Sequence, residues 1–259
     1  MLTLNDVYPV SNSRLTAFKR SPKHLLHYLT RPKDQTPAML FGTAFHCYLL
    51  QPEKFADLYA VAPELDRRTK EGKMEWEVFS ALNADKSILG KSDFDKIVDM
   101  FMAIYANPVA SDILKDLVSK ETDRNWINEE TGVPMRGIID GIGQGFMIDL
   151  KTCADADPYK FARDAYNMNY HRQAAIYLDS HPDGKFMDYY IIAIEKDAPY
   201  GCSVHELSDE LIDAGRKQYI DMLIEYQAWV EAGMPEAGYE YWHYSGVHQM
   251  DLPNYAKLA

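Results

Sequence analysis

The chain has 259 residues, 47% of them hydrophobic, and a formal net charge of −12 at pH 7. No apolar run approaches the roughly 20 residues needed to span a bilayer, and no basic segment followed by an apolar one marks a signal peptide, so a soluble cytoplasmic protein with no membrane partner is expected. The 3 cysteines are too few and too scattered for a disulfide framework. The negative charge argues against nonspecific binding of nucleic acid over the whole surface.

The first part of the chain is predicted to be helical. A short helix is expected over Ser13–Arg20, and Ser21 followed by Pro22 is typical of the start of a second helix, which runs to about Leu29. The apolar segment Met39–Leu50 predicts a buried helix. Further helices are expected over Glu71–Ala81, over Asp93–Ala106 with Ser92 as its N-cap, and over Pro108–Leu117.

A β-hairpin is predicted next. Val133–Ile142 is apolar and rich in β-branched residues, Gly143–Gly145 supplies turn residues, and Phe146–Cys153 is apolar again. Side chains two residues apart in a strand share a face, so Asp149 and Lys151 are expected on one face of the hairpin and the residue between them on the other.

The charged side chains of this largely apolar hairpin include Asp140, Asp149 and Lys151. Charged groups in such a setting are costly to bury without a partner. Two carboxylates on neighbouring strands suit a Mg²⁺ site, and the lysine could position a water molecule beside it. The alternative is a surface hairpin in which Asp149 and Lys151 merely form an ion pair.

The chain as a whole is predicted to have a helical N-terminal part, a central sheet and a closing helix, and an α/β fold is expected. The remaining expected elements are a helix from Asp157 to about Ser180, a buried strand over Met187–Glu195, a strand over Tyr200–Leu207, and a long helix capped by Ser208 and ending near Ala232. No linker defines a second domain. We therefore expect a single domain over residues 1–259, with a mainly helical part (1–118), an α/β core (119–232) and a tail (233–259).

Two further segments complete an ordered set of motifs. Phe41–His46 (Phe-Gly-Thr-Ala-Phe-His) precedes the hairpin, and Gln173 and Tyr177 follow it on one face of a helix. The order His, Asp, Asp-x-Lys, Gln-x-x-x-Tyr resembles the PD-(D/E)XK nuclease superfamily, in particular its RecE-type exonuclease branch (the nuclease domain of exonuclease VIII). The commoner superfamily signature has Glu in place of Asp149. The resemblance covers about residues 11–194 and implies a restriction-endonuclease-like core, a central mixed β-sheet flanked by helices.

The same resemblance implies a site for Mg²⁺ or Mn²⁺. Asp140 would bridge or ligate the ions, Asp149 would ligate one, and the backbone carbonyl of Leu150 would add a ligand. His46 would help to coordinate the metal, and an imidazole favours Mn²⁺ over Mg²⁺; the alternative is a hydrogen-bonded core histidine. Glu121 either contributes to the site or is an exposed glutamate at the start of the strand before the hairpin.

The remaining implied roles belong to three side chains. Lys151 would orient or deprotonate the attacking water, and an ammonium near metal ions should have a lowered pKa. Gln173 would contact the lysine, the water or a substrate phosphate. Tyr177 would support the site or contact DNA. Core packing is the alternative for both Gln173 and Tyr177, because aromatic and amide groups at this spacing commonly pack in a helix interface.

The most basic segment, Asp66–Lys73, contains Arg67, Arg68 and Lys73. By default such a charged run is a solvated loop. Similar segments in RecE-like proteins suggest instead that these side chains grip the DNA backbone or end, because guanidinium groups suit bidentate contacts with phosphates.

Taken with the resemblance, these residues predict a Mg²⁺- or Mn²⁺-dependent exodeoxyribonuclease. It would degrade linear double-stranded DNA from 5′ to 3′, leave 3′ single strands for a RecT-type annealing partner, and form a homo-oligomeric ring. One alternative is a nuclease of the CRISPR-adaptation or helicase-associated group, many of which need four cysteines for an iron–sulfur cluster. The other is a catalytically inert module that binds DNA ends.

Overall fold

The computed structural model describes residues 3–31, 36–239, 246–247 and 249–250. The chain divides into two compact units, the first comprising Met1–Pro32, Ile127–Met135 and Gln218–Ala259, the second Lys33–Trp126 and Arg136–Lys217. Every candidate site residue belongs to the second unit. A single nuclease domain stays a prediction, and more than half of the tail from residue 233 onward lies outside the described residues.

The first unit contains short helices and the end of a long one. They are α1 (Leu4–Val7), α2 (Asn12–Arg20), α3 (Pro22–Thr30) and the part of α11 (Asp209–Glu231) that follows residue 217. Ser21 caps α3 as predicted, because its hydroxyl accepts the N–H of His24 at 3.3 Å. Phe18 packs on Tyr226 and Trp229 with ring centroids 4.9 and 5.5 Å apart. This aromatic cluster forms the core of the unit.

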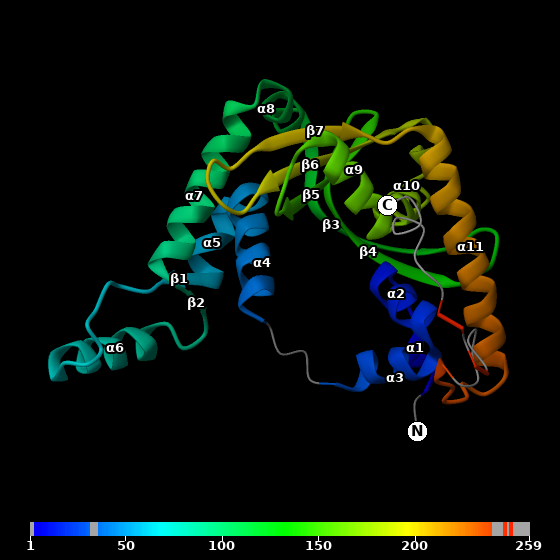
Figure 1. Cartoon of the computed structure of the whole chain (residues 1–259), viewed down its shortest axis with the longest axis horizontal. Helices are drawn as coiled ribbons and strands as arrows, with labels where there is room; N and C mark the ends of the chain where they lie inside the picture. The colour runs from blue at the N-terminus through cyan, green and yellow to red at the C-terminus, as the bar shows by residue number, and fades with distance from the viewer. Residues whose placement is uncertain (1–2, 32–35, 240–245, 248, 251–259) are drawn as a thin grey trace. The chain divides into compact units, whose positions relative to one another are not determined.

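The second unit is built on a five-stranded mixed sheet with the order β3-β4-β5-β6-β7 (Figure 1). The strands are β3 (Leu117–Ile127), β4 (Pro134–Gly143), β5 (Phe146–Cys153), β6 (Asp188–Glu195) and β7 (Cys202–Glu206). β4 and β5 form the predicted antiparallel hairpin, β6 runs parallel to β5, and β7 is antiparallel to β6. The expected α/β class with a central mixed sheet is confirmed.

One face of this sheet is covered by helices α4 (Pro37–Leu50), α7 (Lys91–Ala106) and α8 (Pro108–Lys115). Ile148 and Leu150 of β5 point into this core and are no more than 1% exposed. Because alternate residues face opposite sides, the residues on either side of Leu150 point away from this core. The apolar alternation of β5 thus directs its two charged residues to the other face.

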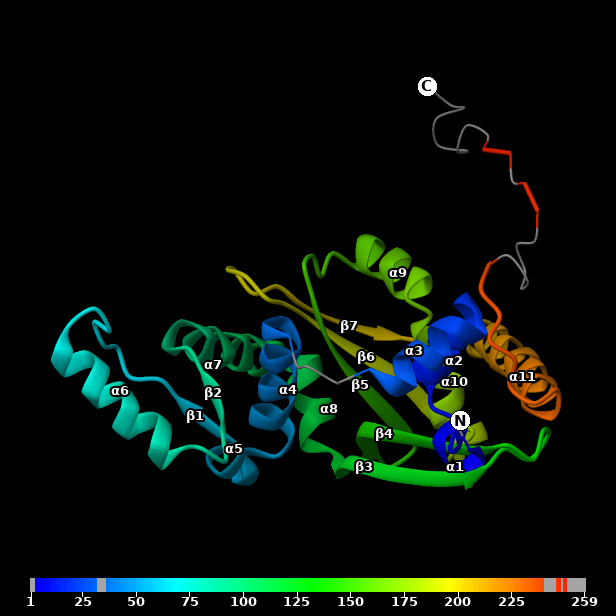
Figure 2. The ribbon, with the colours of Figure 1, turned by 90° about the horizontal axis from the view of Figure 1, so that it is seen from below.

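Smaller elements that the sequence pattern does not predict complete the unit. They are α5 (Pro52–Leu58), β1 (Tyr59–Val61), β2 (Ser87–Leu89) and the 3₁₀ helix η1 (Gly184–Phe186). β1 and β2 form a separate parallel pair. Between them lies α6 (Lys70–Leu82), which extends away from the five-stranded sheet (Figures 1 and 2). Strands of three residues are too short to give a periodic signal.

The predicted single helix from Asp157 to Ser180 is wrong. The structure has two helices, α9 (Pro158–Asn167) and α10 (Tyr170–Leu178). They are separated at Asn169, whose φ of 59° places it in the left-handed region. Asparagine adopts that conformation more easily than other non-glycine residues, so it can break a helix without leaving a proline or glycine in the sequence.

Two predicted boundaries also differ from the structure. α7 begins at Lys91 with Gly90 as its N-cap, not Ser92, because β2 ends at Leu89 and the chain turns into the helix at once. The helix predicted to reach Leu117 ends at Lys115, and Leu117 already begins β3.

Within the part of the chain that the structure describes, no single helix is both long and apolar enough to cross a membrane; α7 and α8 pass that test only as a pair bent by 93°.

Candidate active site

The strands β4 and β5 separate at the point where the acidic residues lie. Their backbone pairing runs from Gly143 opposite Phe146 to Gly141 opposite Ile148. Beyond it, the N–H of Leu150 donates a hydrogen bond of 2.7 Å to Oδ2 of Asp140. An aspartate side chain therefore takes the place of a backbone partner, and the carboxylate is held in the opening between the strands.

A group of three possible metal ligands surrounds this opening. One ligand atom each from His46, Glu121 and Asp140 lies within 4.8 Å of the others. His46 Nδ1 is 3.8 Å from Glu121 Oε1 and 3.7 Å from Asp140 Oδ2. These three residues come from α4, β3 and β4, and two carboxylates with one imidazole are a donor set that suits a divalent cation. The structure thus brings together three of the residues predicted as metal ligands.

Glu121 is predicted to begin a strand, but it lies in the middle of β3. Its φ of 46° is in the left-handed region, which is uncommon for a non-glycine residue. The alternation of half-buried and exposed residues along β3 shifts at Glu121 and Thr122. This irregularity lets Glu121 approach His46, and strained backbone of this kind is frequent at functional sites.

Asp149 and Lys151 share a face, as predicted, and form an ion pair of 2.6 Å. The side chain of Asp149 is 3% exposed, so this is a buried pair that needs further hydrogen bonds. Gln173 supplies them: its amide nitrogen donates to Asp149 at 3.1 Å and its amide oxygen accepts from Lys151 at 3.3 Å. Gln173 is therefore hydrogen-bonded to both members of the charged pair.

Two more of the predicted site groups, the backbone carbonyl of Leu150 and the ring of Tyr177, lie next to β4. N–H and C=O of one residue in a strand point to the same side, so the Leu150 carbonyl faces β4, as its N–H does. The ring of Tyr177 packs closely over Gly137, where a Cβ atom would lie only 2.7 Å from it. Tyr177 thus packs against the backbone of β4 and forms a side-chain hydrogen bond with Gln173.

Tyr170, for which the sequence pattern predicts no role, lies beside Lys151. The ammonium of Lys151 lies 4.7 Å from the centroid of the Tyr170 ring, a cation–π contact. Tyr170 is the first residue of α10, directly after Asn169 with its left-handed backbone. The break between α9 and α10 decides where this ring lies, and the sequence pattern does not predict that break.

The carboxylates dominate the electrostatics of the site. Burial alone would lower the pKa of His46, but Asp140 and Glu121 outweigh it and raise this pKa. Burial raises the pKa of Asp149, while the Lys151 ammonium opposes that shift. Burial would likewise lower the pKa of Lys151, yet Asp149 and Asp140 raise it. This last direction is opposite to the lowered pKa expected beside metal ions, because the charges facing Lys151 here are carboxylates.

The predicted DNA-binding residues lie at and before the start of α6, apart from the group of three ligands. Arg68 makes a bidentate ion pair with Asp66 at 2.9 and 3.1 Å. The guanidinium of Arg67 stacks on the ring of Trp76 at 3.4 Å. Lys73 is exposed. The structure does not bring these residues together with His46 or Asp140.

Comparison with protein families gives a match over residues 11–239 to the family described as "PDDEXK-like domain of unknown function (DUF3799)". The chain belongs to this family. The PDDEXK-like domain places it in the PD-(D/E)XK superfamily, which confirms that part of the predicted resemblance. The RecE-type branch stays a prediction. No curated protein matches the chain.

One solved structure shares the overall fold of this chain. A protein from Eubacterium rectale named "Putative exonuclease" matches with a TM-score of 0.63 at 16% sequence identity, over 98% of this chain and 96% of that one. An alkaline exonuclease from Laribacter hongkongensis matches with a TM-score of 0.32 at 15% identity, over 70% of this chain and 95% of that one. The first match supports the fold, and the second is too low to support a conclusion.

Proposed function

We propose that this PDDEXK-like protein is a metal-dependent deoxyribonuclease that hydrolyses phosphodiester bonds. One observation carries the proposal: Asp140 with His46 and Glu121 forms a group of possible metal ligands, and the Asp149–Lys151–Gln173 set lies on the adjoining strand and helix. Family membership and the exonuclease-like neighbour both support a nuclease.

The donor set fits Mg²⁺ or Mn²⁺. His46, Glu121 and Asp140 would hold the ion, and Asp149 and the carbonyl of Leu150 are the further ligands we propose. When bound, a divalent ion neutralises developing negative charge and makes a water molecule nucleophilic at neutral pH. An imidazole among the ligands favours Mn²⁺.

The chain's own residues supply orientation and charge. Lys151 is held by Asp149, Gln173 and the Tyr170 ring, so its ammonium has a fixed position beside the carboxylates. In that position it would orient the attacking water and stabilise negative charge on the phosphate. Gln173 holds the Asp149 carboxylate and the Lys151 ammonium in fixed positions relative to each other through its two hydrogen bonds.

We further propose that the enzyme is an exonuclease that acts from 5′ to 3′ on linear double-stranded DNA. It would leave 3′ single strands for a RecT-type annealing protein. The net charge of −12 favours a homo-oligomeric ring, because enclosing the duplex retains an acidic protein on its track. Arg67, Arg68 and Lys73 would contact the DNA backbone, although the first two must first leave Trp76 and Asp66.

End-labelled linear and closed circular duplex DNA, incubated with Mg²⁺ or Mn²⁺, tests this function. We expect labelled ends to be lost from linear DNA and circles to remain intact, and 5′ and 3′ labels in separate reactions report the direction. Nicking of circles would identify an endonuclease. Binding without cleavage would identify an inert end-binding module.

The matched variants are Asp149→Asn, which should abolish cleavage, and Asp188→Asn as the control. Asp188 is exposed at the opposite end of the neighbouring strand β6. Normal cleavage by Asp149→Asn would overturn the site assignment. Lys151→Ala should also abolish cleavage, but leaves Asp149 buried without its cation at a cost of about 3–5 kcal/mol, so its folding must be checked by circular dichroism.

A further inference from the structure

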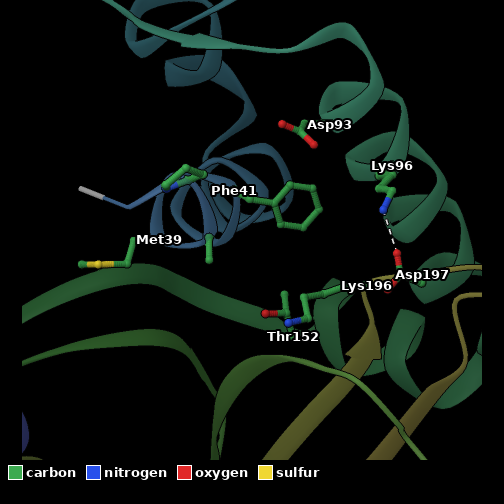
Figure 3. A pocket seen from close by; sticks show the side chains of 9 residues that line it. Met39, Phe41, Asp93, Lys96, Thr152, Lys196 and Asp197 are labelled. Atoms are coloured by element: carbon green, nitrogen blue, oxygen red, sulfur yellow. Dashed lines mark hydrogen bonds and ion pairs between the residues drawn. The ribbon is translucent and has the colours of Figure 1, made fainter. Parts of the chain in front are cut away.

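A second hollow lies beside the candidate active site, between α4, α7 and the ends of β5 and β6 (Figure 3). Its volume is about 540 Å³, within the usual range for ligand sites. Its lining includes Thr152, which directly follows Lys151 in β5. Thr152 lies on the opposite face of β5 from Lys151, so the two side chains face different sides of the same strand end.

This hollow continues toward the possible metal ligands around the start of α4. A neighbouring hollow of about 450 Å³ is lined by His46 and Glu121, and also by Met39. Met39 also lines the hollow that contains Thr152, and this residue is 57% exposed. The two hollows therefore lie on either side of the first turns of α4 and share one lining residue. A polymer bound at His46 could extend into the hollow that contains Thr152.

The chemistry of the lining suits a nucleotide. The ring of Phe41 projects into the hollow from α4, and Thr152 and Lys196 lie at its floor (Figure 3). Lys196 is exposed and has no carboxylate within ion-pair distance among the residues that the structure describes. An aromatic face can stack on any base, and an ammonium and a hydroxyl can contact a phosphate.

The local charge supports the same ligand. Lys96 pairs with Asp197 at 2.7 Å, and Lys196 and Asp93 are the other charged residues of the lining. The hollow thus carries two ammonium groups and two carboxylates, whereas the whole chain carries −12. Since the net charge of the chain repels phosphates, a neutral hollow with an unpaired lysine next to the site is a favourable path for DNA.

We propose that this hollow binds the nucleotide next to the cleaved bond, with its base on Phe41 and its phosphate at Lys196 and Thr152. This inference rests on the proposed function and names the DNA-binding residues that the sequence pattern leaves out. It predicts that DNA contacts extend from the metal ligands past the start of α4 toward α7.

Binding of a fluorescently labelled 12-nucleotide single strand to the full chain, measured by anisotropy at several salt concentrations, tests the proposal. Asp149→Asn serves as the parent, with Mg²⁺ present, so that the strand is not cut. Lys196→Ala should weaken binding of every sequence and reduce the slope of log K against log salt by about 0.7, the value for one phosphate contact on single strands. Lys185→Ala is the control, because Lys185 is exposed in η1, before the start of β6, whereas Lys196 follows the end of that strand.

Phe41 is tested by a pair of substitutions. Phe41 also packs against the apolar core, so Phe41→Leu retains apolar volume and removes the flat ring, while Phe41→Tyr retains the ring. We expect Phe41→Leu to weaken binding about fivefold or more and Phe41→Tyr to bind as the parent does. Parent-like affinity and salt slope in both Lys196→Ala and Phe41→Leu would overturn this inference alone. Absence of binding to this strand by the parent would also overturn this inference. The proposed function falls with it only if the wild type leaves end-labelled linear duplex uncut.

Discussion

Asp140 accepts the backbone N–H of Leu150 at 2.7 Å, across the opening between β4 and β5. The same carboxylate oxygen lies 3.7 Å from His46 Nδ1. One buried side chain therefore closes the gap in the sheet and faces the imidazole of α4. The Asp140 carboxylate therefore has a structural role and a proposed metal-binding role, and two substitutions can separate these roles.

Asp140→Asn should retain the fold and lose activity. The amide can still accept the N–H of Leu150, but it has no charge for a divalent ion, so cleavage should fall by about 100-fold or more. Asp140→Ala should lose activity and also about 1–3 kcal/mol of stability, because the N–H of Leu150 is left buried without a partner. Urea denaturation and cleavage assays on both variants check this, and equal stability of the two would contradict it.

Mn²⁺ binding should depend on His46. Calorimetric titration of the full chain should show binding that weakens by about tenfold or more in His46→Ala. His27→Ala is the control, because His27 is exposed on α3 in the first unit. Mn²⁺ at 100 times its Kd should also stabilise the wild type by about 2.7 kcal/mol against unfolding. Undiminished affinity in His46→Ala would remove this residue from the metal site.

The raised pKa of His46 predicts a pH dependence of metal-free stability. The protonated imidazole is stabilised in the folded state, so its contribution is fully present below the unfolded pKa of about 6.5 and is lost as pH rises through the folded value. In EDTA, the stability advantage of the wild type over His46→Gln should shrink from pH 6 to pH 8.5. A difference that grows with pH would reverse the assigned direction.

Mn²⁺ affinity should change with pH in the opposite sense, because the metal and the proton compete for the imidazole. Affinity should rise as His46 loses its proton, and His46→Ala should flatten this dependence.

Tyr170 is predicted to position Lys151 through its ring and not through its hydroxyl. Tyr170→Phe should cleave DNA at nearly the wild-type rate, whereas Tyr170→Leu should lower kcat by about threefold to thirtyfold with little change in KM. A structural role alone would predict loss of stability in Tyr170→Leu without this split between kcat and KM. Steady-state kinetics and thermal unfolding of both variants distinguish the two.

The local sequence pattern was sufficient to predict the hairpin and the face of the strand on which each of its charged side chains lies. Alternation along Phe146–Cys153 predicts that Asp149 and Lys151 share a face, and the turn glycines predict the antiparallel pairing with β4. Ser21 and Pro22 likewise predict the start of α3. These features depend on neighbours within a few residues, so period and capping rules describe them.

The order of motifs in the sequence also predicted which distant residues contribute to one site, but only the fold decided their contacts. His46 reaches Asp140 and Glu121 because α4 packs on the sheet and the backbone of β3 is left-handed at Glu121. Tyr170 reaches Lys151 because the chain breaks at Asn169. A single left-handed residue leaves no periodic signal, and packing between elements far apart in the chain is set by the shape of the whole core.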